Sequence, residues 1–508
     1  MKDTYKLSRA AILYAGVITL LLPCLLFVLG WVRPMFAIPS ALMLIISACY
    51  CCRNTVRNWN QEYMYCSFST KDAVKLALTL IGLLLFVDIV GVVGHVQQAT
   101  DFAVRNAIYS ELQKSPWPIF SAKGEYFVYY HSFWLPPALL SKIIPVNISD
   151  GLLFVWIYIT LSISALTLFT KIKGRVLLFF IIFILGGNII EILKVIPTLL
   201  DRYGTTIPCA NSLSTFCSAF AIESHFRYLN VWSQFVYTFN HAVPLVLYTT
   251  MILSGLIPVR YILYISALVF SASPLGVAPL LPVLFYIIFK NKAFCCTILR
   301  WENWIATLFV LISIVYFCGQ INDHTNAVML WQDYEYWSRV NGTDGAFVNI
   351  HVRFLRYTSV ALAIISTIWI VTTARIRRSI WFGSFVYLAI ILPIIWIGKW
   401  NNELLFKGSL VLFMLFAWLL VKQWEASSTK RKIAIIAIVF LSSLHIVNDI
   451  SRRQLYHYTW DHTEMKKNKR NEWGGTLNKP DNYAYGNFWG VNKFPSILTN
   501  APDKGLIK

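Results

Sequence analysis

The chain has 508 residues, of which 57% are hydrophobic and only 13% are charged, and its mean hydropathy is +0.59. This composition excludes an ordinary water-soluble protein and predicts an all-α polytopic membrane protein. The formal net charge of +20 would suit a nucleic-acid-binding protein. The basic residues lie instead in short segments between apolar runs, so we expect membrane lipids as partners and no nucleic acid.

Apolar runs long enough to cross a bilayer, about 20 residues each, recur along most of the chain. We predict about 13 spans, near 11–31, 36–52, 74–94, 150–170, 175–195, 231–255, 260–272, 273–290, 302–319, 352–373, 379–397, 404–421 and 433–447. They form one transmembrane domain over residues 1–447, followed by a tail at 448–508. The long loops, which are expected to contain short helices, are 96–149, 196–230 and 320–351.

The distribution of Lys and Arg predicts the orientation of the chain. With the N-terminus placed inside, the inside segments carry 21 of these residues and the outside loops carry 9. We therefore expect a multi-pass membrane protein with a cytoplasmic N-terminus and a C-terminus on the outer side. The count holds only if residues 132–145 do not cross the membrane, so we expect them to lie on the outer face or dip into it.

The loop at 96–149 is polar and aromatic, and it opens on Asp101. Arg105, Tyr109 and Gln113 follow it at intervals of four residues, which is the spacing of one face of a helix. The spacing predicts a helix that ends before Pro116-Trp117-Pro118. The loop then closes on a run of ring-bearing side chains, which are Tyr126, Phe127, Tyr129, Tyr130, His131 and Trp134. A long loop of this kind is where we expect chemistry.

Two later spans are polar at their predicted outer ends. The span at 231–255 carries Trp232, Asn240, His241 and Pro244, which predict a kinked helix that lines a cavity. The span that starts near residue 404 carries Lys407 close to Asn402. A cation at this depth reaches lipid head groups or binds a lipid-linked phosphate, and its amide neighbours favour the phosphate.

The cysteines give no metal-binding pattern. Cys51-Cys52 and Cys295-Cys296 are adjacent pairs without further ligands at useful spacing, so we assign no metal site. Cys209 and Cys217 share one outer loop, and a disulfide between them and two free thiols are equally consistent with the sequence.

The polar residues of the first loop and the later spans resemble the pattern of bacterial membrane proteins of the glycosyltransferase C superfamily. In the first loop the resemblance rests on Asp101, Arg105, Asn106, Leu112, Trp117-Pro118, Tyr129-Tyr130 and Leu135-Pro136. It continues with Trp232 to Pro244, Ser273-Pro274 and Asn402 to Ser409, and it covers most of 70–420. Many members carry an acidic pair where this chain has Asp101 followed by Phe102, which leaves a divalent-metal requirement open.

The resemblance implies a hexosyl- or pentosyltransferase of cell-envelope polysaccharide synthesis in the bacterial cytoplasmic (inner) membrane, with a periplasmic or extracellular C-terminus. It would move a sugar from a polyprenyl-phosphate donor to a lipid-linked glycan or other acceptor on the outer face, with inversion. Asp101 would be the general base, although an Asp before a helix also serves as an N-cap. The expected donor-phosphate ligands are Arg105, Arg202 and Lys407. The expected substrate-binding residues are Asn106, Glu111, Trp117, Tyr129, Tyr130, His131, Trp232, Asn240, His241 and Asn402.

Two other functions are kept as alternatives. A polymerase or ligase of surface polysaccharide shares the long outer loops and the lipid-linked substrates. A flippase or transporter of lipid-linked oligosaccharide predicts ionisable residues in span centres and internal repeats. The spans hold few such residues, chiefly Asp88 and Glu191, and we find no repeat.

The predicted orientation is testable by labelling single cysteines introduced at Lys173 and Asn482. We expect a membrane-impermeant maleimide to label position 482 in intact cells and position 173 only after the membrane is opened. Labelling of both positions from the same side would contradict the orientation.

Overall fold

Helices make up most of the part of the chain that the computed structural model describes, which is residues 4–98, 102–120, 126–144, 151–187, 230–321, 328–330, 350–397, 403–452 and 488–489. Within it, six helical stretches are long and apolar enough to cross a membrane. They are α1 (Arg9–Trp31), α2 (Pro34–Arg57), α4 (Thr70–Val90), the stretch Gly151–Gly186, α12 (Val231–Ser254) and α22 (Glu403–Trp424). A mostly helical membrane protein is therefore confirmed, whereas the number of 13 spans stays a prediction.

The other elements are shorter or are described only in part. The stretch Gly151–Gly186 comprises α8 (Gly151–Ile172), η2 (Lys173–Arg175), α9 (Val176–Ile181) and η3 (Ile182–Gly186). The remaining apolar helices are α13 (Ile262–Phe270), α14 (Pro274–Val277), α15 (Leu281–Lys290), α17 (Trp301–Ile321), α19 (Ile350–Val371), α21 (Ile380–Ile394) and α23 (Thr429–Arg452). The connecting helices and 3-10 turns are α3 (Gln61–Met64), α5 (Phe102–Lys114), η1 (Ser132–Trp134), α6 (Leu135–Ser141), η6 (Val259–Tyr261), η7 (Ala278–Leu280), α16 (Phe294–Ile298) and α20 (Ala374–Arg377).

Among the described residues, three small antiparallel strand pairs join segments that are far apart in the sequence. The pairs are β1 (Thr4–Ser8) with β2 (Tyr65–Ser69), β3 (Tyr126–Phe127) with β6 (Phe488–Trp489), and β4 (Val328–Leu330) with β5 (Ile395–Ile397). Each pair adds backbone hydrogen bonds at an end of the bundle, so the helical fold class is unchanged.

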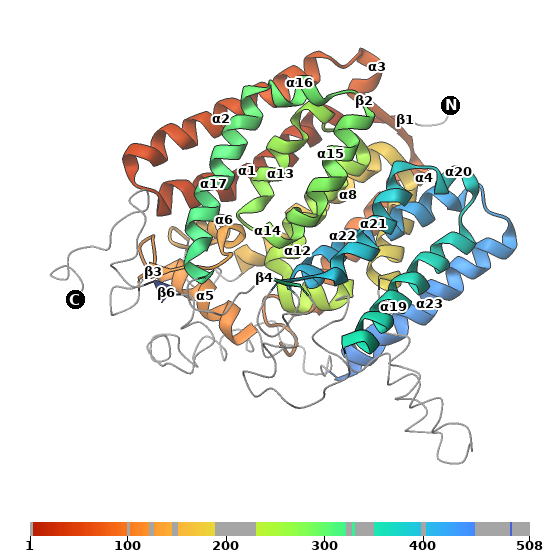
Figure 1. Cartoon of the computed structure of the whole chain (residues 1–508). Helices are drawn as coiled ribbons and strands as arrows, with labels where there is room; N and C mark the ends of the chain where they lie inside the picture. The colour runs from red at the N-terminus through yellow and green to blue at the C-terminus, as the bar shows by residue number, and fades with distance from the viewer. Residues whose placement is uncertain are drawn as a thin grey trace.

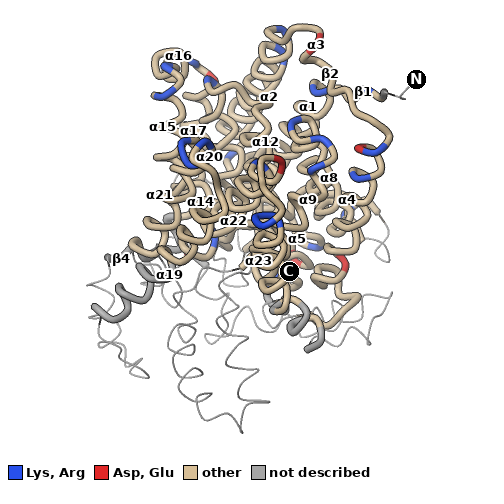
Figure 2. Tube along the Cα trace, turned by 90° about the vertical axis from the view of Figure 1, so that its right-hand side faces the viewer, with Lys and Arg blue, Asp and Glu red and all other residues tan. Residues whose placement is uncertain are grey.

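The two ends of the bundle differ. Figure 1 shows α5, β3 and β4 at one end, which we call the α5 end, and α3 and α16 at the other, which we call the α16 end. Basic residues occupy the last turns of α2, α8, α15, α20 and α22, and Figure 2 shows Lys and Arg gathered at α16 and α20. A cation in the last turn of a helix is stabilised by the helix dipole.

Residues 132–145, predicted not to cross, contain a helix too short to do so. Helix α6 has seven residues, which is about 10 Å of helix against the roughly 30 Å of a bilayer core. Its first residues are buried against the bundle, since Leu135 and Ala138 have no exposed surface.

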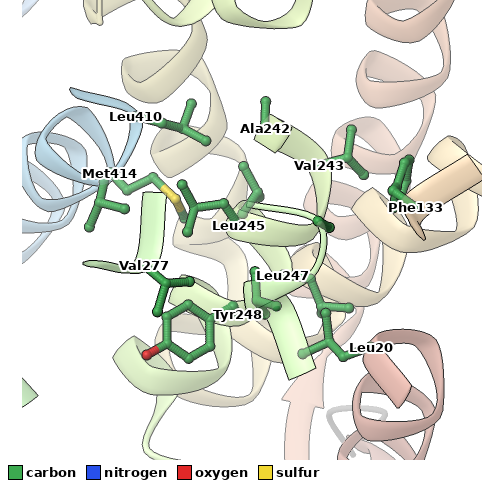
Figure 3. Packing of buried hydrophobic residues seen from close by; sticks show 14 of the residues in the cluster. Leu20, Phe133, Ala242, Val243, Leu245, Leu247, Tyr248, Val277, Leu410 and Met414 are labelled. Carbon is green, nitrogen blue, oxygen red and sulfur yellow. The ribbon is translucent and has the colours of Figure 1, made fainter. Parts of the chain in front are cut away.

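Helices α12 and α22 form the centre of the bundle. In their most apolar windows 83% and 94% of the residues are buried, against 28% in α4, which therefore lies at the periphery. Figure 3 shows Leu410 and Met414 of α22 facing Leu245 of α12. Gly408 lets α22 approach its neighbours, because a Cβ atom there would lie 2.4 Å from a methyl carbon of Leu392.

The predicted kink in α12 is present. Thr238 has non-helical backbone angles inside the helix, and Pro244 lies six residues later. A proline removes one backbone donor and clashes with the carbonyl of the residue four positions earlier, which here is Asn240. The kink therefore falls in the half of α12 that carries the polar residues.

Tyr316 of α17 anchors the aromatic segment that follows β3. Its hydroxyl oxygen accepts a hydrogen bond from the Tyr129 backbone amide at 2.9 Å and approaches the Phe127 carbonyl at 3.2 Å. The Tyr316 side chain is fully buried. One phenol thus fixes the path of the backbone that carries Tyr129, Tyr130 and His131.

We predict that Tyr316→Phe lowers the free energy of unfolding by about 1–3 kcal/mol, because it removes a partner from buried polar backbone groups. Thermal unfolding of the detergent-purified protein should show a lower midpoint. The matched control is Tyr286→Phe, because Tyr286 is 52% exposed. Equal midpoints for the two variants would contradict the anchoring role.

Candidate functional site

Helix α5 forms where the sequence predicted it and stops where Pro116 requires. It runs from Phe102 to Lys114, and the peptide bond between Trp117 and Pro118 is cis. Glu111 accepts a hydrogen bond from Ser115, and the Trp117 indole donates to the Leu112 carbonyl at 3.0 Å. These bonds stay within the end of α5, so the structure does not bring Glu111 and Trp117 to the cluster described next.

Lys407 lies in the first turns of α22, at the α5 end of the bundle. Its side chain is buried, with 5% of the residue exposed, and it forms an ion pair with Glu403 one turn earlier. Its ammonium nitrogen lies 5.5 Å from the centre of the Tyr130 ring. A buried ammonium needs such partners, because leaving water costs the charge several kcal/mol.

Tyr130 links Lys407 to the polar half of α12. Its ring lies 5.0 Å from the His241 ring, and its backbone carbonyl accepts a hydrogen bond from the Asn240 amide at 3.2 Å. Burial, with smaller contributions from Glu403 and Tyr129, raises the pKa of the Tyr130 phenol. The hydroxyl therefore keeps its proton and can donate a hydrogen bond.

Arg105 joins the same group of residues from α5. It is 7% exposed, and its guanidinium carbon lies 5.9 Å from the centre of the Phe102 ring. Both Arg105 and Lys407 lie close enough to His241 for an electrostatic interaction. We call Arg105, Tyr130, His241, Glu403 and Lys407 the Lys407 cluster. Two of the three predicted phosphate ligands are thus near the same imidazole.

Two polar atoms in and beside the cluster lack hydrogen-bond partners among the described residues. They are the Asn240 side-chain oxygen and the Nδ1 atom of His241, and both are buried. Buried polar groups in folded proteins are nearly always hydrogen-bonded, so these two atoms, side by side in α12, are candidates for binding a ligand or water. Asn240 and His241 were both predicted to bind substrate.

Other predicted residues lie close to this cluster but have structural contacts. His131 is fully buried between Trp31 and Tyr316, with the two rings 4.3 and 5.9 Å from its own. Burial lowers the pKa of the His131 imidazole to about 3, so the ring is neutral at physiological pH and is not a phosphate-binding cation. The Tyr129 ring stacks on Trp134 at 6.0 Å.

Two more predicted residues anchor the helices around the cluster. Asn106 donates a hydrogen bond to the Gln98 side chain at 2.6 Å, and Trp232 packs against Phe86 of α4 at 6.0 Å. The remaining predicted site residues, which are Asp101, Arg202 and Asn402, lie outside the described residues, as do Cys209 and Cys217.

The structure adds pairings that the sequence did not predict. Gln234 of α12 donates a hydrogen bond to Ser409 of α22 at 2.9 Å, which holds the two central helices together beside Lys407. Glu403 could have been recognised from its spacing of four residues from Lys407, which places both side chains on one face of a helix. The pairing of Gln234 with Ser409 could not have been recognised in this way, because the two residues are 175 positions apart in the sequence.

No three His, Cys, Asp or Glu side chains gather into a metal-binding group in the part of the chain that the structure describes. The question of a divalent metal therefore stays open.

Comparison with known proteins finds no matching family model, no matching curated protein and no matching solved structure.

The ion pair predicts an asymmetry between two variants. Glu403→Gln leaves the buried Lys407 ammonium without its carboxylate and should lower the free energy of unfolding by about 3 kcal/mol. Lys407→Met should cost about 1 kcal/mol, because the Glu403 side chain is 29% exposed and can turn to water. Unfolding midpoints in detergent measure the difference, with Glu62→Gln in exposed α3 as the control. A larger loss for Lys407→Met would contradict this account of the pair.

Proposed function

We propose that the chain is a membrane glycosyltransferase that uses a polyprenyl-phosphate-linked sugar as donor. The observation that supports this most directly is the Lys407 cluster, where buried Arg105 and Lys407 come from distant parts of the chain to the same imidazole. The sequence resemblance to the glycosyltransferase C superfamily names the reaction class. The acceptor is then a lipid-linked glycan or another acceptor of the cell envelope.

The cluster has the chemistry that a lipid-linked phosphate requires. Cations hold the phosphate and neutralise the charge that develops when the sugar leaves, and their effect is large where water is excluded. Tyr130 can donate a hydrogen bond to the same region. Asn240 and His241 offer the unpartnered polar atoms that sugar hydroxyls would bind. Arg202 is proposed as a third cation on sequence grounds.

The base is proposed to be Asp101, which directly precedes α5 and stands four residues before Arg105. It would take the proton from the acceptor hydroxyl as that oxygen attacks the anomeric carbon. The reaction would invert the anomeric configuration, because the acceptor attacks opposite the leaving phosphate.

The proposed orientation places this chemistry on the outer face of the cytoplasmic membrane. The basic last turns at the α16 end would then lie in the cytoplasm, and the α5 end would face outward. About 13 spans and an outer tail at 448–508 complete the proposal. A polymerase or ligase would also act on this face, so the glycosyltransferase is distinguished from it by the donor that the enzyme uses.

Asp101→Asn separates a catalytic base from a helix cap, because asparagine caps a helix about as well but cannot accept the proton. We predict a transfer rate lower by roughly a hundredfold or more, with normal membrane insertion. The assay follows labelled sugar from polyprenyl-phosphate hexose and pentose donors into membranes of cells that carry the wild-type chain or the variant.

Membranes of cells that lack the chain provide the background for this assay. Transfer only from a diphosphate-linked oligosaccharide would favour the polymerase or ligase. Movement of lipid-linked oligosaccharide without formation of a new bond would favour the flippase. Wild-type rates for Asp101→Asn would place the base elsewhere.

A further inference from the structure

The end of α4 carries a carboxylate–imidazole pair that the proposed mechanism has not used. Asp88 and His95 lie on either side of a tight turn, and the carboxylate oxygen Oδ1 of Asp88 is 2.6 Å from the ring nitrogen Nδ1 of His95. The side chains of Asp88 and His95 are 19% and 12% exposed, so the pair is mostly buried but still accessible to a ligand. The carboxylate fixes the orientation of the imidazole, and when the ring is protonated the pair is a salt bridge.

The turn that returns His95 to Asp88 is held by several hydrogen bonds. Gly91 ends α4 with a φ of 87° and donates to the Asp88 carbonyl at 3.0 Å, and Gly94 has a φ of 77°. The Gln98 side chain donates to the Gly91 carbonyl at 2.8 Å. Only glycine adopts such backbone angles at low cost, so this sequence specifies the turn. His95 is therefore held in one place before any ligand binds.

The turn is connected directly to the elements that carry the Lys407 cluster. Gln98 accepts a hydrogen bond from Asn106, the neighbour of Arg105 in α5. Phe102 of α5 packs on Phe239 of α12 with ring centres 6.0 Å apart. At the end of α4, Phe86 packs against Phe235 of α12 at 4.8 Å. The end of α4, α5 and the polar half of α12 thus form adjoining walls of one region.

We infer that His95, oriented by Asp88, is a further ligand of the donor phosphate and binds the charge that appears on it during transfer. This inference rests on the proposed function. The donor is a phosphodiester with one negative charge. As the acceptor oxygen bonds to the anomeric carbon, the bond from that carbon to the phosphate oxygen breaks and its electron pair stays on the oxygen. The polyprenyl phosphate leaves as a monoester with a second charge, and the acceptor proton goes to the base.

A protonated His95 ring would donate a hydrogen bond from Nε2 to the oxygen that gains this charge. The contact is stronger with the leaving phosphate than with the donor, and only such a difference accelerates the reaction. Arg105 and Lys407 bind the phosphate before and after transfer, and His95 adds one further hydrogen bond to the oxygen that gains the charge.

The test measures binding of two short lipid probes to the full chain in nanodiscs at one fixed pH. Farnesyl phosphate stands for the leaving monoester, and farnesyl methyl phosphate stands for the singly charged donor. Wild-type protein should bind the monoester more tightly than the diester. His95→Gln and Asp88→Asn should reduce this preference about tenfold, the usual worth of one charge-assisted hydrogen bond, while binding the diester as before. Lys407→Met should weaken the binding of both probes, the singly charged diester included.

The outcomes separate the two proposals. If the wild type binds neither phosphate better than farnesol, the donor site is wrong and the role of His95 falls with it. If the wild type prefers the monoester and both His95→Gln and Asp88→Asn keep that preference, the role of His95 is overturned and the donor site stands. Loss of both probes in His95→Gln and Asp88→Asn, with lower unfolding midpoints, would show that the pair only supports the fold.

Discussion

The contact between α12 and α22 is the constraint on which the rest of the bundle depends. These two helices are buried on almost every side, so every other apolar helix packs directly or indirectly on them. The hydrogen bond from Gln234 to Ser409 fixes how α12 and α22 are positioned, and Gly408 lets α22 also approach Leu392 of α21 closely. Because lipid cannot replace a lost polar partner, this bond has more influence on helix placement inside the bundle than it would on a wet surface. Lys407 is thereby held where Tyr130 and His241 can reach it.

The polar groups at the α5 end stand out because the surrounding helices are so apolar. A buried cation costs free energy unless it is paired, and Lys407 is paired with only one carboxylate in the described part of the chain. The kink in α12 adds to this cost, since it interrupts backbone hydrogen bonding beside Asn240 and His241. Costs of this kind persist in a stable protein when they serve ligand binding, and here they concentrate at one end of the two central helices.

Features encoded by neighbouring residues were predictable from the sequence, and features made by distant residues were not. The start and end of α5 follow from helical spacing and Pro116, and the kink in α12 follows from Pro244. Lys407 was identifiable as a cation within a span. The partners of these residues were not, because Tyr130 meets His241 across more than a hundred residues of sequence and Ser409 meets Gln234 at a separation of 175. Such pairings depend on how whole helices pack, which periodicity alone does not determine.

The Asp88–His95 pair was predictable only in part, because it depends on the turn that follows α4. An acid within a span was visible in the sequence as an ionisable residue to be explained. Its partner seven residues later was not, since the pairing requires left-handed backbone at both Gly91 and Gly94. Once the turn is formed, Gln98 links it to Asn106 and so to α5, the helix that carries Arg105. In the proposed reaction the permanently charged residues bind the phosphate before and after transfer, and the imidazole adds a hydrogen bond to the oxygen that gains a charge when the sugar leaves.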